Sequence, residues 1–163
     1  IVAPGFALAP PASIDLAIVA NVVHTLMAEG AAERVFGDIF AALKPGGVLG
    51  VEQHRASSTG VQSPSAETGY VQEAYVRALA REAGFEFVKG DDINANPDDT
   101  RDHPFGVWTL PPSLRTAPLG QPEDSGFDTA PYQAIGESDR MTLKFRKPAA
   151  PQPVAPQPAP APT

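Results

Sequence analysis

Two histidines and an asparagine follow apolar runs at spacings that would place them at one edge of a sheet. Asn21 and His24 end the run 15–24, and His54 follows the run 48–53. A neutral imidazole can take a proton from a nucleophile, and an amide can orient a bound molecule. We therefore predict catalytic roles for both histidines. The alternative is that Asn21 caps the next turn and that His24 is a half-buried side chain whose hydrogen bonds are satisfied.

Arg55 directly follows His54 at the end of the second run. Its planar guanidinium can bind the carboxylate or phosphate of a substrate. The alternative is an ion pair with Glu52 or with an aspartate of the later loop. A metal site on the two histidines would need a carboxylate whose position the sequence does not give.

A second group of polar residues lies in the long irregular segment 91–115. Its members are candidates for substrate binding: Asn94, Asn96, Asp99, Arg101, Asp102 and His103. Asparagine and aspartate also stabilise turns, because their side chains bond to nearby backbone. We predict mixed use of this segment, with Trp108 either walling a substrate pocket or packing in the core.

Ser138 is a candidate for a different reaction, hydrolysis. With His54 and Asp99 it would supply the nucleophile, base and carboxylate of a hydrolase. The chain has no Gly-x-Ser-x-Gly elbow, so this interpretation is disfavoured. We instead predict a structural role, in which Asp139 and Arg140 tie the last strand to the long loop.

Alternating strands and helices must position these residues, and the pattern predicts an α/β fold. The apolar content of 14–23 predicts a strand buried on both faces, as at the centre of a parallel sheet. Apolar residues at helical spacing predict helices from about 31 and from about 69, ended by Pro45-Gly46-Gly47 and by Gly84. Further strands are predicted at 48–53, from 85 to 88 and at 141–147, and loops at 56–65 and 113–130.

Composition limits the partners and the organisation of the chain. The formal net charge is −7 with no Lys/Arg cluster, which argues against nucleic acid as a partner. No apolar run approaches the roughly 20 residues of a membrane span. The chain has no cysteine, which fits either the cytoplasm or export with a signal encoded upstream. We predict a linker at 1–13, a domain at 14–147, and a disordered Pro/Ala/Gln-rich tail at 148–163.

Several segments of the chain carry a resemblance to a known family: Asp15 to His24, Leu43 to Gly47, Glu52 to Arg55, Thr68 to Val71, Asp92 to Pro97, Asp102 to Pro111 and Ile135 to Lys144. Together they resemble the C-terminal part of bacterial predicted class I S-adenosylmethionine-dependent methyltransferases, over most of residues 13–147. The Lys-Pro-Gly-Gly turn is common to many methyltransferases, whereas the Asn-Ala-Asn-Pro and Ser-Asp-Arg-Met strings are more particular.

This resemblance implies a Rossmann-like sheet in which the chain supplies the fourth to seventh strands, the last one antiparallel. It implies S-adenosylmethionine as cofactor, with Asn21 and Val22 beside it, and a small-molecule substrate between the strand ends and the segment 91–115. The glycine-rich cofactor loop and the acidic ribose ligand would lie upstream. We therefore expect the isolated chain to bind the cofactor weakly or not at all.

Two other function classes are weighed against this one. The chain would be a noncatalytic binding or interaction domain if it kept the sheet but had lost cofactor binding. A nicotinamide-dependent oxidoreductase is disfavoured, because the chain lacks both a glycine-rich turn and a Tyr-x-x-x-Lys pair. A sheet without its first strands would also expose an apolar edge, so we expect self-association through the strand at 14–23.

Overall fold

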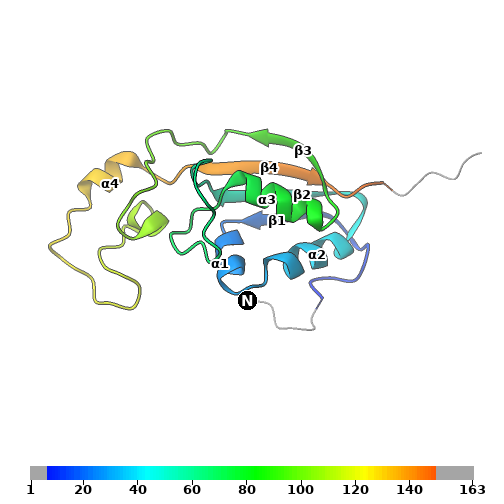
Figure 1. Ribbon diagram of the computed structural model, residues 1–163, viewed down its shortest axis with the longest axis horizontal. Helices are drawn as coiled ribbons and strands as arrows, with labels where there is room; N and C mark the ends of the chain where they lie inside the picture. The colour runs from blue at the N-terminus through cyan, green and yellow to red at the C-terminus, as the bar shows by residue number, and fades with distance from the viewer. Residues whose placement is uncertain (1–6, 150–163) are drawn as a thin grey trace, which may run out of the picture.

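Four strands form one mixed sheet in the computed structural model, which describes residues 7–149 (Figure 1). The order is β1-β2-β4-β3, with β1 and β2 parallel and β4 antiparallel to both of its neighbours. This arrangement confirms the predicted α/β fold with an antiparallel last strand. The strands are β1 (Ile14–Ala20), β2 (Leu43–His54), β3 (Glu86–Asp91) and β4 (Arg140–Arg146).

Helices cover one face of this sheet. The amphipathic helices α2 (Ala32–Ala42) and α3 (Glu73–Glu82) pack on it, and the short α1 (Val23–Ala28) follows β1. The 3-10 turn at Gly106–Thr109, the helix α4 (Ala130–Ile135) and long loops form a lobe beyond the carboxyl ends of β1 and β2 (Figure 1). The lobe therefore lies at the edge where open α/β sheets bind ligands.

The hydrophobic core lies between the sheet and the helices. Alternate residues of β2 and β4 point into it, as the period of two in a strand requires. Removing such side chains from water contributes about 25 cal/mol per Å² of apolar surface. The core side chains include Val19, Phe36, Ile39, Leu49, Val51, Val76, Leu79, Leu143 and Phe145.

The opposite face of the sheet is open at β1. Leu16 and Ile18 are 57% and 69% exposed, and β1 is an edge strand. The prediction of a strand buried on both faces is therefore wrong for the residues described. Its physical reason is that no further strand or helix within 7–149 lies against this edge and face.

The ends of several elements differ from the predictions. β1 stops at Ala20 because Asn21 adopts a positive φ of 49°, so that Val22 and Val23 leave the strand and α1 begins. β2 begins at Leu43, and a bulge opposite β1 absorbs the Pro-Gly-Gly segment. The predicted helix at 69–84 starts only at Glu73, while the buried Val71 forms a bridge with Arg55.

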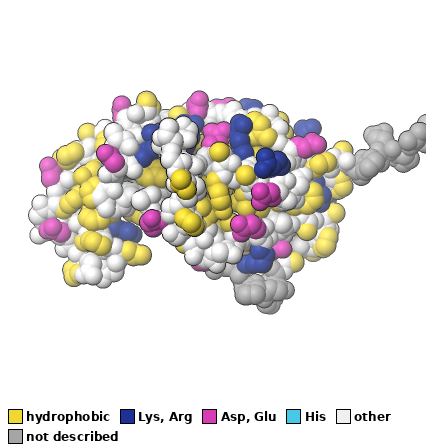
Figure 2. All heavy atoms as spheres, viewed as in Figure 1, with side chains coloured by type: hydrophobic (Ala, Val, Ile, Leu, Met, Phe, Trp, Pro, Cys, Tyr) yellow, Lys and Arg dark blue, Asp and Glu magenta, His cyan; other side chains and the backbone are white. Residues whose placement is uncertain are grey.

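The other predicted elements agree with the structure. The helix from about 31, the strands near 85–88 and 141–147 and the loop at 56–65 are present. The helix α4 begins at the last residue of the predicted loop 113–130 and lies otherwise in a segment for which no element was predicted. The predicted tail lies outside the described residues from 150 onward, as do residues 1–6 of the predicted linker. Figure 2 shows basic side chains scattered among acidic ones on the face that it presents. No helix described is both long and apolar enough to cross a membrane.

Candidate functional site

His24 and His54 come together at the carboxyl ends of the parallel strands, as the sequence predicts. His24 lies in the first turn of α1 and His54 ends β2, and their ring centroids are 5.7 Å apart. The ring of Trp108 meets His24 edge-on at 5.7 Å, and the ring of Tyr70 lies 6.4 Å from His54. Two imidazoles between aromatic rings make a compact, partly apolar site.

Gln53 fixes the tautomer of His24. Its Oε1 accepts a hydrogen bond from the backbone N–H of Val23, which leaves Nε2 as the donor to the Gly69 carbonyl at 2.9 Å and to His24 Nδ1 at 3.1 Å. His24 Nδ1 is therefore an acceptor, and in the neutral ring the proton resides on Nε2. His24 consequently offers an N–H donor rather than a free base.

His54 is the candidate base of the pair. Its Nδ1 lies 2.6 Å from the hydroxyl of Ser138, so Nε2 holds the lone pair when Nδ1 donates to that hydroxyl. Burial, and then the charges of His24 and Arg140, lower the pKa of His54 to about 4. Burial also lowers the pKa of His24, although its bond to Gln53 opposes this. Both rings are neutral at pH 7.

Asn21 carries an unpaired polar atom at the same strand end. Its backbone N–H donates to the Glu52 carbonyl at 2.8 Å, which holds the positive-φ turn. Its side-chain Oδ1 is buried without a hydrogen-bond partner among the residues described. Such an acceptor costs free energy unless a donor reaches it, so this oxygen is suited to a bound molecule. Val22, also predicted to lie beside a cofactor, is the half-buried N-cap of α1.

Asp139 anchors a charged network beside this site. Its side chain is 2% exposed and accepts two bonds of 2.9 Å from Arg55, one from Arg101 and one from the backbone of Asn96. Burial alone would raise its pKa, but the two guanidiniums outweigh this and lower it to about 2. Arg55 also pairs with Asp92 at 2.9 Å, which is the predicted pairing with a later-loop aspartate.

Asp99 is a second buried carboxylate with a full set of partners. The Tyr70 hydroxyl donates to it and lies 2.9 and 2.8 Å from its two oxygens, and His103 Nε2 lies 2.8 Å from Oδ1. The backbone N–H groups of Arg101 and Asp139 donate to it as well. Burial and the bond to Asp99 raise the pKa of Tyr70. Asp99 and His103 therefore hold the lobe together.

The remaining candidates bind the long loop to its surroundings. Asn94 donates to the Thr142 hydroxyl at 3.0 Å, and Asn96 donates to the carbonyls of Ile135 and Glu137. Trp108 carries the guanidinium of Arg115 over its ring at 5.1 Å. Within residues 7–149, no group of three or more histidine, aspartate or glutamate side chains is arranged so that it could hold a metal ion.

Gln53, which bonds to His24, is not among the site residues predicted from the sequence. It is fully buried, on the same strand face as Leu49 and Val51. The alternating pattern of β2 could have identified it. That pattern places the amide of Gln53 on the core side of the strand, where an unpaired polar group is costly. Such a residue has to be bonded to a neighbour, and here the neighbour is His24.

Solved structures share this fold, although no family model and no curated protein matches the sequence. The cyclase SpnF is 18% identical with a TM-score of 0.51, over 88% of this chain and 53% of that one. A SAM-dependent methyltransferase from Methanosarcina mazei is 11% identical with a TM-score of 0.52, over 88% and 63%. The chain thus has the Rossmann-like class I methyltransferase fold and spans between half and two thirds of these proteins.

Proposed function

We propose that the chain is part of an S-adenosylmethionine-dependent methyltransferase that acts on a small molecule. The supporting observation is the site at the carboxyl ends of β1 and β2, where Asn21 with its unpaired oxygen follows β1 and two neutral imidazoles lie together. The shared fold with the methyltransferase from Methanosarcina mazei supports the same proposal. The fold alone does not decide the reaction, because the equally similar SpnF is a cyclase.

The cofactor fits the Asn21 end of this site. The amino group and hydroxyls of S-adenosylmethionine are donors, and the buried Oδ1 of Asn21 is an acceptor without a partner in the described chain. We assign Asn21 and the adjacent Val22 to cofactor binding. When bound, S-adenosylmethionine supplies a methyl group on a sulfonium sulfur, which an aligned nucleophile can accept.

The imidazoles act on the acceptor molecule. In this proposal His54 accepts the proton at Nε2 when the nucleophile has to lose one, with its Nδ1 donating to the Ser138 hydroxyl. His24 orients the acceptor by donating from Nε2, since Gln53 occupies its Nδ1. A pKa of about 4 makes His54 a weak base, so alignment rather than proton transfer carries most of the rate.

The rest of the cofactor site is proposed to pair with β1. The free edge of β1 and the exposed Leu16 and Ile18 suit a further parallel strand and its covering helix. In this proposal the domain at 14–147 receives a glycine-rich loop from upstream sequence. Without that sequence, the same edge pairs with a second copy of the chain.

Calorimetric titration with S-adenosylhomocysteine tests the proposal on two proteins, the product of the whole reading frame and the 163-residue chain. We expect micromolar binding to the first and at least tenfold weaker binding to the second. In the first protein, His54→Gln should retain the affinity. Absence of binding to the first protein would refute the methyltransferase proposal and favour the noncatalytic binding domain.

A further inference from the structure

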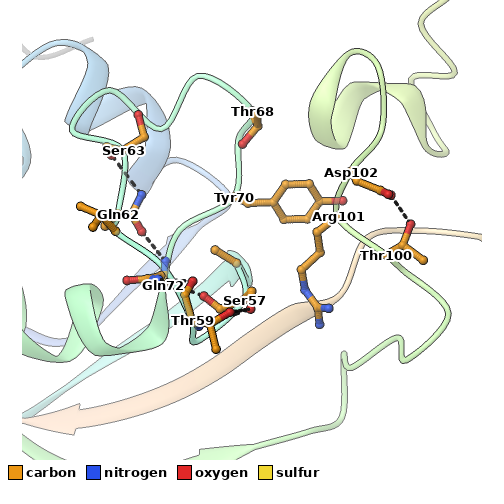
Figure 3. Close-up of a pocket in the computed structure, with 12 residues that line it drawn as sticks. Ser57, Thr59, Gln62, Ser63, Thr68, Tyr70, Gln72, Thr100, Arg101 and Asp102 are labelled. Atoms are coloured by element: carbon orange, nitrogen blue, oxygen red, sulfur yellow. Dashed lines mark hydrogen bonds between the residues drawn. The ribbon is translucent and has the colours of Figure 1, made fainter.

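Two adjoining hollows lie between the loop 56–63, the start of α3 and the segment 100–102. Their volumes are about 330 and 320 Å³, and Ser57, Gln72 and Arg101 line both. Figure 3 shows the larger one framed by Tyr70 and Arg101 on one side and by Ser57, Thr59 and Gln72 on the other. Most residues that line the two hollows carry a hydroxyl, amide or guanidinium group, so a ligand can make several polar contacts there.

Arg101 is held rigidly between the two hollows. Its φ of 67° is uncommon for a side-chain-bearing residue, and its backbone N–H donates to Asp99 at 2.9 Å. Its Nε donates to the Arg55 carbonyl at 2.8 Å, and Nη2 donates to Asp139. The guanidinium is therefore fixed before any ligand arrives, which lowers the entropic cost of binding.

The two arginines have more donors than the protein uses. A guanidinium carries five N–H donors. Arg55 uses three in bonds to Asp139 and Asp92, and Arg101 uses two, so both retain donors without an acceptor among the described residues. Both side chains line the smaller hollow. The unused donors call for a ligand that is rich in acceptors.

The two carboxylates that line the hollows have partners other than Arg55 and Arg101. Asp102 accepts the Thr100 hydroxyl, and Glu73 pairs with Arg77 at 2.9 Å on α3. Tyr70, in the wall of the larger hollow, lies 6.4 Å from the His54 ring. A ligand anchored at Arg101 thus extends along the wall that borders the imidazole pair.

We propose that Arg101, with Arg55, binds a carboxylate or phosphate group of a small ligand in the smaller hollow. The hydroxyl and amide side chains of the larger hollow then hold the body of that ligand. The assignment of this ligand as the methyl acceptor rests on the proposed function. The binding of the oxyanion itself does not, and it requires no cofactor.

Titration of the 163-residue chain with inorganic phosphate and with citrate, at constant ionic strength, tests the site through NMR shifts and thermal stabilisation. We expect saturable binding of at least one probe, and which probe binds distinguishes phosphate from carboxylate ligands. A net charge of −7 opposes nonspecific attraction of either anion. Arg101→Gln should weaken the binding at least tenfold, whereas Arg81→Gln on the exposed side of α3 should leave it unchanged.

Ser57→Asp provides a test that leaves the Asp139 network intact. Ser57 is exposed, so the variant should fold normally, and its new carboxylate should repel the oxyanion and weaken binding at least tenfold. Ser113→Asp makes the same charge change at an exposed site outside both hollows and is the control. Failure of both probes to bind, or equal weakening by Ser57→Asp and Ser113→Asp, would overturn the proposal. Titration with S-adenosylhomocysteine reports separately on the methyltransferase proposal.

Discussion

The two polar regions of this chain both contain asparagine and histidine side chains but differ in how fully their polar groups are bonded. In the lobe, Asp99 and Asp139 are almost completely buried, and each accepts several hydrogen bonds. At the strand ends, Asn21 has an unpaired oxygen, and His54 has only its Nδ1 bonded. The first region uses its buried carboxylates to fix a loop, while the second leaves the Asn21 oxygen without a partner among the described residues.

Residue type and density therefore do not by themselves identify a ligand-binding site. A saturated buried network stabilises only while every partner is present, because each lost partner leaves a buried polar group unpaired. A polar group without a partner at a ligand-binding edge differs from this, because no group of the described chain bonds to it. The two regions should therefore respond oppositely to substitution.

The largest expected effect comes from breaking the lobe network. Asp139→Ala leaves Arg55 and Arg101 without their shared carboxylate and should lower the free energy of unfolding by about 3–5 kcal/mol. Urea denaturation followed by circular dichroism measures this. The control is Asp15→Ala, which removes an 80%-exposed partner of Lys44 and should cost less than about 1 kcal/mol. Equal losses of unfolding free energy in Asp139→Ala and Asp15→Ala would contradict this prediction, because the buried and the exposed carboxylate would then contribute alike.

A smaller effect is expected from the pH dependence of His54. Its pKa is lowered from 6.5 to about 4 in the folded chain, so the unfolded state binds more protons between these values. Stability should therefore fall as the pH drops from 6.5 to 4, by at most about 3 kcal/mol. His54→Gln should reduce this dependence in urea titrations at several pH values. If the unfolding free energy of His54→Gln depends on pH as strongly as that of the unsubstituted chain, the lowered pKa of His54 is not the cause of the dependence.

The smallest effect on folding is expected at the β1 edge. Ile18→Lys places a charge on an exposed side chain and should change the free energy of unfolding by less than about 0.5 kcal/mol. It should nevertheless abolish self-association of the 163-residue chain, which light scattering at high concentration would detect. A monodisperse monomer in the unsubstituted chain would show that this edge does not pair.

The sequence predicted the fold better than the site. Apolar periodicity located β1, α2, β2 and α3, and the parallel pairing of β1 with β2 brought His24 to His54 as expected. Periodicity cannot show which side chains bond to each other across the chain. Asp139 lies 84 residues from Arg55, and Gln53 lies 29 from His24, so these contacts depend on tertiary packing.

The boundaries were missed for local reasons. Asn21 ends β1 through its positive φ, although the apolar Val22 and Val23 continue the strand pattern. The Pro-Gly-Gly segment continues into β2 because Ile14 pairs with Leu43 across a bulge. Both departures follow from backbone conformation, which hydrophobic patterning does not encode.

Two asparagine substitutions test the contrast between the regions most directly. In the whole-reading-frame protein, Asn21→Gly removes the unpaired oxygen and permits the positive φ, so we predict unchanged stability and at least tenfold weaker binding of S-adenosylhomocysteine. Asn94→Ala removes the bond to Thr142, so we predict a loss of about 1 kcal/mol of stability and unchanged affinity. Equal affinity in the two variants, measured by calorimetric titration, would contradict the assignment of the open strand-end site.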